Sequence, residues 1–211
     1  MKNKIGIMGG TFHPIHYGHL MIAENAYEQF DLEQVIFLPT GHAPHKEFAG
    51  NDMTKHRCEM VRLAVADNPH FTISLREAER ERTSYTYQTL ETMRSEYPDK
   101  ELYFILGADS LFSLDTWAHP ERICASAVIL AAVRDNLTET RVDEMIKDLQ
   151  NRYHAEIHRL ITPNFNVSSA AIRARVRQGE TIRYLLPDAA AEYIAEHHLY
   201  REQPEAEGST D

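Results

Sequence analysis

Short apolar runs rich in β-branched residues alternate along the chain with longer amphipathic segments. The runs predict strands over 4–8, 35–39, 71–75, 101–107, 127–133 and 156–161. The 3.6-residue periodicity of the segments predicts helices over 16–30, 54–67, 86–97, 140–153, 168–178 and 187–199. Because nearly continuous apolar strands alternate with helices, the pattern predicts an α/β fold with a parallel sheet covered on both faces.

In such a fold, ligands bind beyond the carboxyl ends of the strands. We therefore expect the ligand site in the loops 9–15, 40–53, 76–86, 107–119, 134–139 and 162–168. In the predicted helix 54–67, the apolar side consists of Cys58, Val61, Leu63, Ala64 and Val65. The charged side chains of that helix are expected to face solvent: Lys55, Arg57, Glu59 and Arg62.

Composition narrows the class of protein. Of the 211 residues, 43% are apolar and 26% are charged, as in ordinary globular proteins, and we expect a single domain over 1–202 with a disordered acidic tail over 203–211. The formal net charge of −10 argues against a general nucleic-acid-binding surface. No apolar run is long enough for a signal peptide or a membrane span, so we expect a cytoplasmic protein without a membrane partner. Cys58 and Cys124 lack CxxC spacing and are expected to be reduced and structural.

The first predicted strand leads into the stretch GGTFHPIHYGHL, which combines a glycine turn with the start of a helix. Gly9 and Gly10 permit backbone angles and a close approach that side chains would block. Backbone N–H groups and the helix dipole converge at such a turn and attract anions. His16 and His19 share one face of the helix start, and Gly18 between them leaves space for a ligand. The stretch therefore predicts a phosphate-binding site.

Other interpretations of this stretch fit less well. The dinucleotide fingerprint GxGxxG is absent, and the second strand ends at Pro39 and Thr40 without an acid for a ribose, which argues against a dehydrogenase. The P-loop pattern GxxxxGK[ST] is absent as well. His13, His16 and His19 could converge on zinc, but no nearby carboxylate or cysteine completes a usual ligand set, so no metal site is expected. Two solvent-facing histidines remain the purely structural alternative.

GGTFHPIHYGHL resembles the signature of the HxGH nucleotidyltransferases, a Rossmann-like group that joins a nucleotide to a phosphorylated or carboxylated acceptor and releases pyrophosphate. Further stretches resemble segments of the nicotinate-nucleotide adenylyltransferases in this group: APHK (43–46), SYTYQT (84–89), GADS (107–110) and NVSSAAIR (166–173). With Trp117, the matches run in the expected order from residue 5 to about 199. The resemblance implies adenylyl transfer from ATP to nicotinate mononucleotide, giving nicotinate adenine dinucleotide and pyrophosphate in NAD biosynthesis.

The resemblance also assigns roles to individual residues. It implies that the catalytic residues are His16, His19, Lys46 and Arg173. It implies that nicotinate mononucleotide is bound by Gly9, Gly10, Thr11, Tyr85, Thr86, Asp109 and Trp117, with the indole stacked on the pyridine ring. It implies that ATP is bound by His16, Gly18, His19, Lys46, Gly107, Arg134, Ser168, Ser169 and Arg173. Mg²⁺ is expected to arrive with ATP rather than in a protein metal site, and the formation of a homo-oligomer is left open.

Several of these residues also have a simpler structural interpretation. Ser168 fits a plain helix N-cap, and Lys46 fits a solvated loop lysine. Trp117 fits core packing, and Asp109 fits a residue of a helix N-terminus. The functional interpretation of each depends on its setting among the other motifs.

Two positions depart from the family pattern. His13 stands where the family usually has Asp, which changes how the turn is braced or adds positive charge near the phosphates. Ala170 stands where Thr or Ser is common and removes one hydroxyl contact.

Two alternative functions remain. The nearer is another HxGH transferase, such as a pantetheine-phosphate adenylyltransferase or a cytidylyltransferase, against which the SYT segment, Trp117 and the SSAAIR segment argue. The other is a non-catalytic nucleotide sensor, against which the retained histidines, Lys46 and Arg173 argue. The residues themselves are compatible with nicotinate or nicotinamide mononucleotide as the acceptor, and the resemblance favours the acid.

Overall fold

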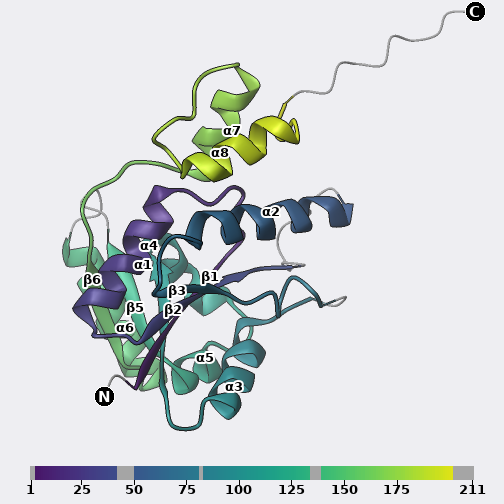
Figure 1. The fold of residues 1–211 in the computed structure, drawn as a ribbon. Coiled ribbons are helices and arrows are strands. Elements are labelled where there is room, and N and C mark those ends of the chain that lie inside the picture. Colours follow the sequence, from purple (N-terminus) through teal and green to yellow (C-terminus); the bar gives the residue numbers. More distant parts are fainter. Residues whose placement is uncertain (1–2, 42–49, 81–82, 134–138, 202–211) are drawn as a thin grey trace, which may run out of the picture.

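The computed structural model describes residues 3–41, 50–80, 83–133 and 139–201. These residues form a six-stranded sheet of β1 (Lys4–Gly10), β2 (Gln34–Pro39), β3 (Phe71–Ile73), β4 (Glu101–Gly107), β5 (Val128–Val133) and β6 (Ile157–Ile161) (Figure 1). The strands pair in the order β3–β2–β1–β4–β5–β6, and every pairing is parallel. The predicted strands and the Rossmann-like α/β class are confirmed, with strand ends within two residues of those expected.

The helices are α1 (Tyr17–Gln29), α2 (Gly50–Val65), α3 (Thr86–Glu96), α4 (Ala108–Ser113), α5 (Pro120–Ser126), α6 (Glu139–Tyr153), α7 (Ser169–Arg177) and α8 (Asp188–Glu196), with a 3₁₀ turn η1 (Leu114–Thr116). The predicted loop 107–119 was wrong in part, since it contains α4 and η1, and α5 was not predicted. These elements are too short for a 3.6-residue period to emerge. Pro120 at the first position of α5 is the local signal that marks its start.

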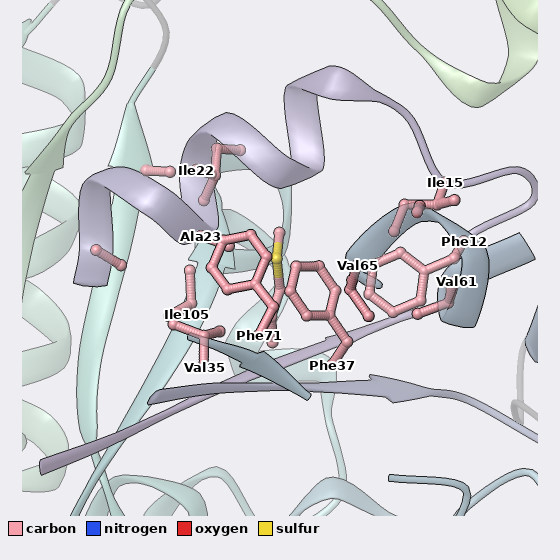
Figure 2. Close-up of a cluster of buried hydrophobic side chains, with 14 of the residues drawn as sticks. Phe12, Ile15, Ile22, Ala23, Val35, Phe37, Val61, Val65, Phe71 and Ile105 are labelled. Atoms are coloured by element: carbon pink, nitrogen blue, oxygen red, sulfur yellow. The ribbon is translucent and has the colours of Figure 1, made fainter. Parts of the chain in front are cut away.

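Alternate side chains of each strand enter two apolar cores, one on each face of the sheet. Helices α1 and α2 cover the first face, where the rings of Phe37 and Phe71 pack with centroids 5.1 Å apart (Figure 2). Helix α8 packs against α2 on the side away from the sheet (Figure 1). Helices α3 to α6 cover the second face. This two-sided burial explains why β5 is buried at every position and carries no alternation of polar residues.

The order of the strands places β1 in the middle of the sheet, between β2 and β4. The chain runs outward from β1 to β3 and then returns to β4 on the other side of β1. Ligands of open α/β sheets bind where the strand order reverses in this way, outside the carboxyl ends of the strands. The glycine turn at the end of β1 lies at this point, and the Thr40 N–H donates to the Gly10 carbonyl at 2.9 Å.

Two further expectations concern single features. Cys58 and Cys124 are free thiols, as predicted, and burial raises the pKa of Cys124 to about 11, so this thiol stays protonated at neutral pH. Among the helices that the structure describes, none combines the length and the apolar character needed to cross a membrane.

Replacing Phe37 by alanine should test the first core. The ring is fully buried between the sheet and α2, so Phe37→Ala should lower the free energy of unfolding by about 3–5 kcal/mol. Ile161→Thr is the control, because Ile161 is 71% exposed and the change should stay within about 0.5 kcal/mol. Urea denaturation of both variants measures the difference, and equal effects would contradict the assigned core.

Candidate functional site

The turn after β1 is anchored by Phe12, whose ring enters the core below α1 and α2 (Figure 2). Phe12 is 2% exposed, and its ring lies 5.8 Å from that of Phe37. Its φ of 45° lies in the left-handed region, which costs a non-glycine residue on the order of 1–3 kcal/mol. A Cβ on Gly10 would lie 3.0 Å from the Phe12 ring, so Gly10 provides the space for it. Burial of this ring therefore holds the glycine turn in a conformation that the backbone alone disfavours.

His16 and His19 begin α1 as a stacked pair of imidazoles. Their ring centroids are 3.7 Å apart at an interplanar angle of 23°. The backbone N–H of His16 donates to Nδ1 of His19 at 3.3 Å. Because Nδ1 accepts, the proton of the neutral His19 ring lies on Nε2. Nε2 is therefore the atom through which this ring can donate to an anion.

Gly18 has a packing role that the sequence did not indicate. A Cβ there would lie 3.0 Å from Nδ1 of His16 and 3.1 Å from Cγ1 of Val167. The space beside Gly18 is therefore filled by these two side chains, whereas we expected it to admit a ligand. Gly18 allows the His16 ring, which is only 3% exposed, to pack under the segment that leads into α7.

The start of α7 reaches back to the same turn. Ser168 caps the helix by accepting from the Ala171 N–H at 3.2 Å, as its N-cap interpretation predicted. The Ser169 hydroxyl donates to the Pro14 carbonyl at 2.8 Å. Nη1 of Arg173 donates to the His13 carbonyl at 2.6 Å. The structure thus brings Ser168, Ser169 and Arg173 to the turn that precedes the two histidines.

His13, which stands where the family usually has Asp, makes contacts that hold it in place. The His13 ring lies edge-on to Tyr200, with centroids 5.0 Å apart. With its carbonyl held by Arg173, His13 is braced through its backbone and through ring packing. This bracing replaces any brace that a carboxylate at this position would supply.

Arg57 corrects the prediction that the charged residues of this helix face solvent. It is 0% exposed, and its guanidinium donates to the Thr11 carbonyl at 2.6 Å and to the Thr40 carbonyl at 2.7 Å. The periodicity contained a signal, because Arg57 is four and seven residues before the buried Val61 and Ala64 and so shares their face. Because a buried charge is costly unless it is hydrogen-bonded, the two carbonyls account for how this guanidinium is accommodated on the apolar face.

A cavity of about 610 Å³ opens beside the turn on the α3 side. It brings together most of the residues assigned to nicotinate mononucleotide, namely Gly9, Gly10, Thr11, Tyr85, Thr86 and Trp117. The Trp117 ring lies edge-on to Phe104 with centroids 6.4 Å apart and forms part of the wall. Tyr85 is the N-cap of α3 and Thr86 its first residue, so the positive end of the helix dipole lies at the cavity. The lining fits a flat ring that carries a negative group.

Glu77 also lines the cavity, and the sequence did not single it out. Its carboxylate accepts from the Thr89 hydroxyl at 2.8 Å, and its carbonyl accepts from the Ser84 hydroxyl at 3.5 Å. Burial raises the pKa of Glu77, only partly offset by the Thr89 hydrogen bond. The Glu77 carbonyl also lies 2.2 Å from where a Cβ on Gly41 would be, so only glycine fits there. Glu77 therefore ties the SYT segment to the end of β2.

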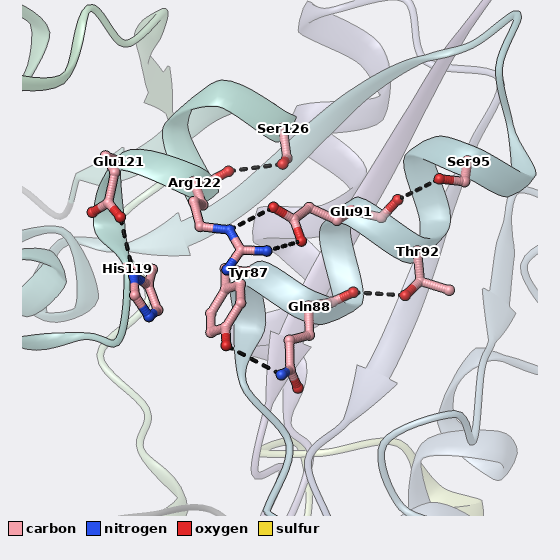
Figure 3. A network of polar contacts seen from close by, with 9 residues as sticks. All are labelled: Tyr87, Gln88, Glu91, Thr92, Ser95, His119, Glu121, Arg122 and Ser126. Carbon is pink, nitrogen blue, oxygen red and sulfur yellow. Dashed lines mark hydrogen bonds and ion pairs between the residues drawn. The ribbon is translucent and has the colours of Figure 1, made fainter.

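A polar network joins the two helices that form the cavity wall (Figure 3). Arg122 of α5 binds Glu91 of α3 through two hydrogen bonds of 2.7 and 2.5 Å and lies 4.2 Å from the Tyr87 ring centroid. Glu91 lies nearly two helical turns along α3 from Tyr85, and Arg122 follows the loop that carries Trp117. The network therefore fixes the spacing between the aromatic wall and the α3 N-terminus.

The remaining predicted residues lie apart from this cavity or outside the described chain. Gly107 ends β4, and a Cβ there would meet no atom within 4 Å, so the surface beside it is open. Asp109 is exposed in the first turn of α4 and is not part of the cavity lining. Lys46 and Arg134 lie outside the described residues.

Two other features bear on the choice of site. A larger groove of about 730 Å³ between α7 and α8 contains none of the motif residues. Within the described ranges, no three His, Cys, Asp or Glu side chains are grouped so that they could bind one metal ion.

The sheet order, the glycine turn and the stacked histidines define an α/β protein of nucleotidyltransferase type. A family model described as cytidylyltransferase-like matches residues 7–175, and the chain belongs to this family. A probable nicotinate-nucleotide adenylyltransferase of Lachnoclostridium phytofermentans is 45% identical over 93% of this chain and 98% of its own length. The protein of the same name from Moorella thermoacetica is 42% identical over 94% and 92%. The resemblance drawn from the motifs is thereby confirmed.

Solved structures show the same fold. Plasmodium falciparum nicotinic acid mononucleotide adenylyltransferase complexed with NaAD has a TM-score of 0.76 at 19% identity, covering 95% of this chain and 98% of the other. The same enzyme complexed with APC has a TM-score of 0.72 at 19% identity, covering 94% and 97%.

The buried carboxyl of Glu77 predicts a pH dependence of stability. Because its pKa is raised, the folded chain retains a proton that the unfolded chain has already released. Wild-type stability should therefore fall as the pH rises from the ordinary carboxyl pKa through that of folded Glu77. Glu77→Gln keeps an acceptor for Thr89 and stays neutral, so its stability relative to the wild type should increase as the pH rises above the ordinary carboxyl value of 4.5.

Urea denaturation at pH values on both sides of the ordinary carboxyl pKa measures the difference. Glu96→Gln is the control of opposite sign: the hydrogen bond from Arg76 lowers the pKa of Glu96, so the stability of this variant relative to the wild type should fall as the pH rises toward the ordinary carboxyl pKa. A Glu77→Gln curve parallel to that of the wild type would show that Glu77 is not held in its neutral form.

Proposed function

We propose that this chain is a nicotinate-nucleotide adenylyltransferase, which transfers the adenylyl group of ATP to nicotinate mononucleotide in the cytoplasm. The observation that carries the proposal is the cavity that unites the glycine turn with Tyr85, Thr86 and Trp117. The names of relatives that are 42–45% identical over nearly their whole length support the same activity.

The reaction is an in-line displacement at phosphorus. An oxygen of the acceptor 5′-phosphate attacks the α-phosphorus of ATP, and a new P–O bond forms. The bond from the α-phosphorus to the bridging oxygen breaks, and pyrophosphate leaves with the electron pair. The attacking phosphate is already an anion, so no catalytic base is required. Catalysis depends on bringing two anions together and on stabilising charge at the transferring group.

The geometry divides the substrates between the two sides of the glycine turn. The nicotinate ring lies in the cavity against Trp117, and its carboxylate is met by backbone N–H groups at the start of α3. Thr11 and the Gly9–Gly10 backbone hold the acceptor phosphate, because they line the cavity next to the histidine side. Nε2 of His19, with His16 stacked behind it, donates to the α- and β-phosphates.

The remaining roles complete the ATP side. Arg173 uses Nη1 to hold His13, and its other N–H groups extend toward the triphosphate. Lys46 and Arg134 add positive charge, and Gly107, Ser168 and Ser169 form the nucleotide wall. On the acceptor side, Asp109 binds the ribose of nicotinate mononucleotide. Mg²⁺ enters with ATP and is held by phosphates and water.

An acceptor assay tests the function. Purified protein is incubated with ATP and either nicotinate or nicotinamide mononucleotide, and pyrophosphate is followed; kcat/KM should be higher for the acid because of the α3 N-terminus. Trp117 is the only tryptophan, so its fluorescence reports ring binding independently of turnover. Fluorescence quenching without pyrophosphate release would identify a nucleotide sensor, and activity only with CTP or another acceptor would identify a different transferase.

Removal of His19 tests the mechanism. If Nε2 donates to the transferring phosphate, His19→Ala should lower kcat by about 10²–10³-fold, as for loss of one donor to a developing anion. His158→Ala is the control, because His158 lies on β6 with its side chain 46% exposed, and kcat should not change. A folded His19→Ala variant with wild-type kcat would falsify the proposed role.

A further inference from the structure

Arg57 joins the two loops that end β1 and β2. Besides its bonds to the Thr11 and Thr40 carbonyls, Nη2 donates to the Thr54 hydroxyl at 3.1 Å, so the guanidinium plane is fixed by three oxygens. The side chain is completely buried and thus does not touch the substrates. Burial lowers its pKa, yet an arginine remains charged in proteins.

The two carbonyl contacts determine the direction of two backbone donors. In a planar trans peptide, the C=O and the following N–H point in opposite directions. Because the Thr11 and Thr40 carbonyls point at Arg57, the N–H groups of Phe12 and Gly41 point away from it. Thr11 and Thr40 both line the cavity, so the peptides that Arg57 holds lie at its edge.

We propose that Arg57 is a positioning residue for the adenylyl transfer, which acts by aiming the Phe12 and Gly41 N–H groups at the phosphates that meet beside the glycine turn. The proposal rests on the proposed function. The guanidinium binds the carbonyl oxygens on one side of these two peptides, and the N–H groups on the opposite side face the phosphates. The two carbonyls need donors at a fixed angle and spacing, which a planar guanidinium supplies and a lysine ammonium does not.

Three variants separate positioning from stability. Arg57→Met removes all three hydrogen bonds, and Arg57→Lys keeps the charge with a single donor group. Leu149→Ala is the matched control, because Leu149 is fully buried on α6 in the core of the other sheet face, so its truncation lowers stability away from both loops. Each variant is assayed well below its melting temperature, with circular dichroism as the measure of folding, for kcat and for the KM of both substrates.

We expect kcat of Arg57→Met to fall by about 10²-fold, because a displacement of about 1 Å in the donors has an effect of this size. Each KM should stay within about threefold, since ground-state binding uses other contacts. Arg57→Lys should recover part of the loss, and Leu149→Ala should keep the wild-type kcat despite a lower melting temperature. If Arg57→Met does not fold, the same split between kcat and KM in Arg57→Lys carries the test.

Two results would overturn the proposal: a kcat for folded Arg57→Met or Arg57→Lys equal to that of Leu149→Ala, or a change confined to KM. A wild-type protein that releases no pyrophosphate contradicts the proposed function instead. The two failures are therefore distinguishable in one set of measurements.

Discussion

The glycine turn after β1 is held from behind by two buried groups of different chemistry. The Phe12 ring fills a place in the apolar core that only a left-handed backbone at this residue allows it to reach. The Arg57 guanidinium takes up the carbonyls that this conformation turns inward. Together Phe12 and Arg57 hold the glycine turn in one conformation before a ligand binds. Hydrogen-bond donors that are already in position need no rearrangement during the reaction. This preorganisation is the main source of electrostatic catalysis.

The turn borders two differently built regions. On one side, α3, α4 and α5 form a half-apolar cavity with a helix N-terminus at its edge. On the other, α1 and α7 contribute imidazoles and an arginine around the 13–16 segment. Gly9, Gly10 and Thr11 line the first region, while the Phe12 ring contacts that of His19 in the second, with centroids 5.1 Å apart. The cavity suits the nicotinate ring, and the side with the imidazoles and the arginine suits phosphates. The boundary between them therefore suits the phosphate of the acceptor.

Much of the fold could be predicted from the sequence because burial on both faces leaves continuous apolar strands and periodic helices. The helices α4 and α5 could not, since six or seven residues do not establish a period. At the site, the paired histidines and the Ser168 N-cap could be predicted because each depends on residues that lie close together in the sequence. Arg57 and Glu77 were misplaced or missed because key partners are distant in the sequence: Thr40 and Thr11 are 17 and 46 residues from Arg57, and Thr89 is 12 residues from Glu77. A single sequence gives no sign of which distant carbonyl or hydroxyl a buried charge will meet.

The hydrogen bonds from Ser169 and Arg173 to Pro14 and His13 connect residues 155 and 160 positions apart. The residues that line the ring cavity, by contrast, all precede position 124. A chain leaving the ribosome therefore contains the described lining of the ring cavity before α7 is made to brace the histidine turn. The phosphate side of the site is completed later in synthesis than this lining.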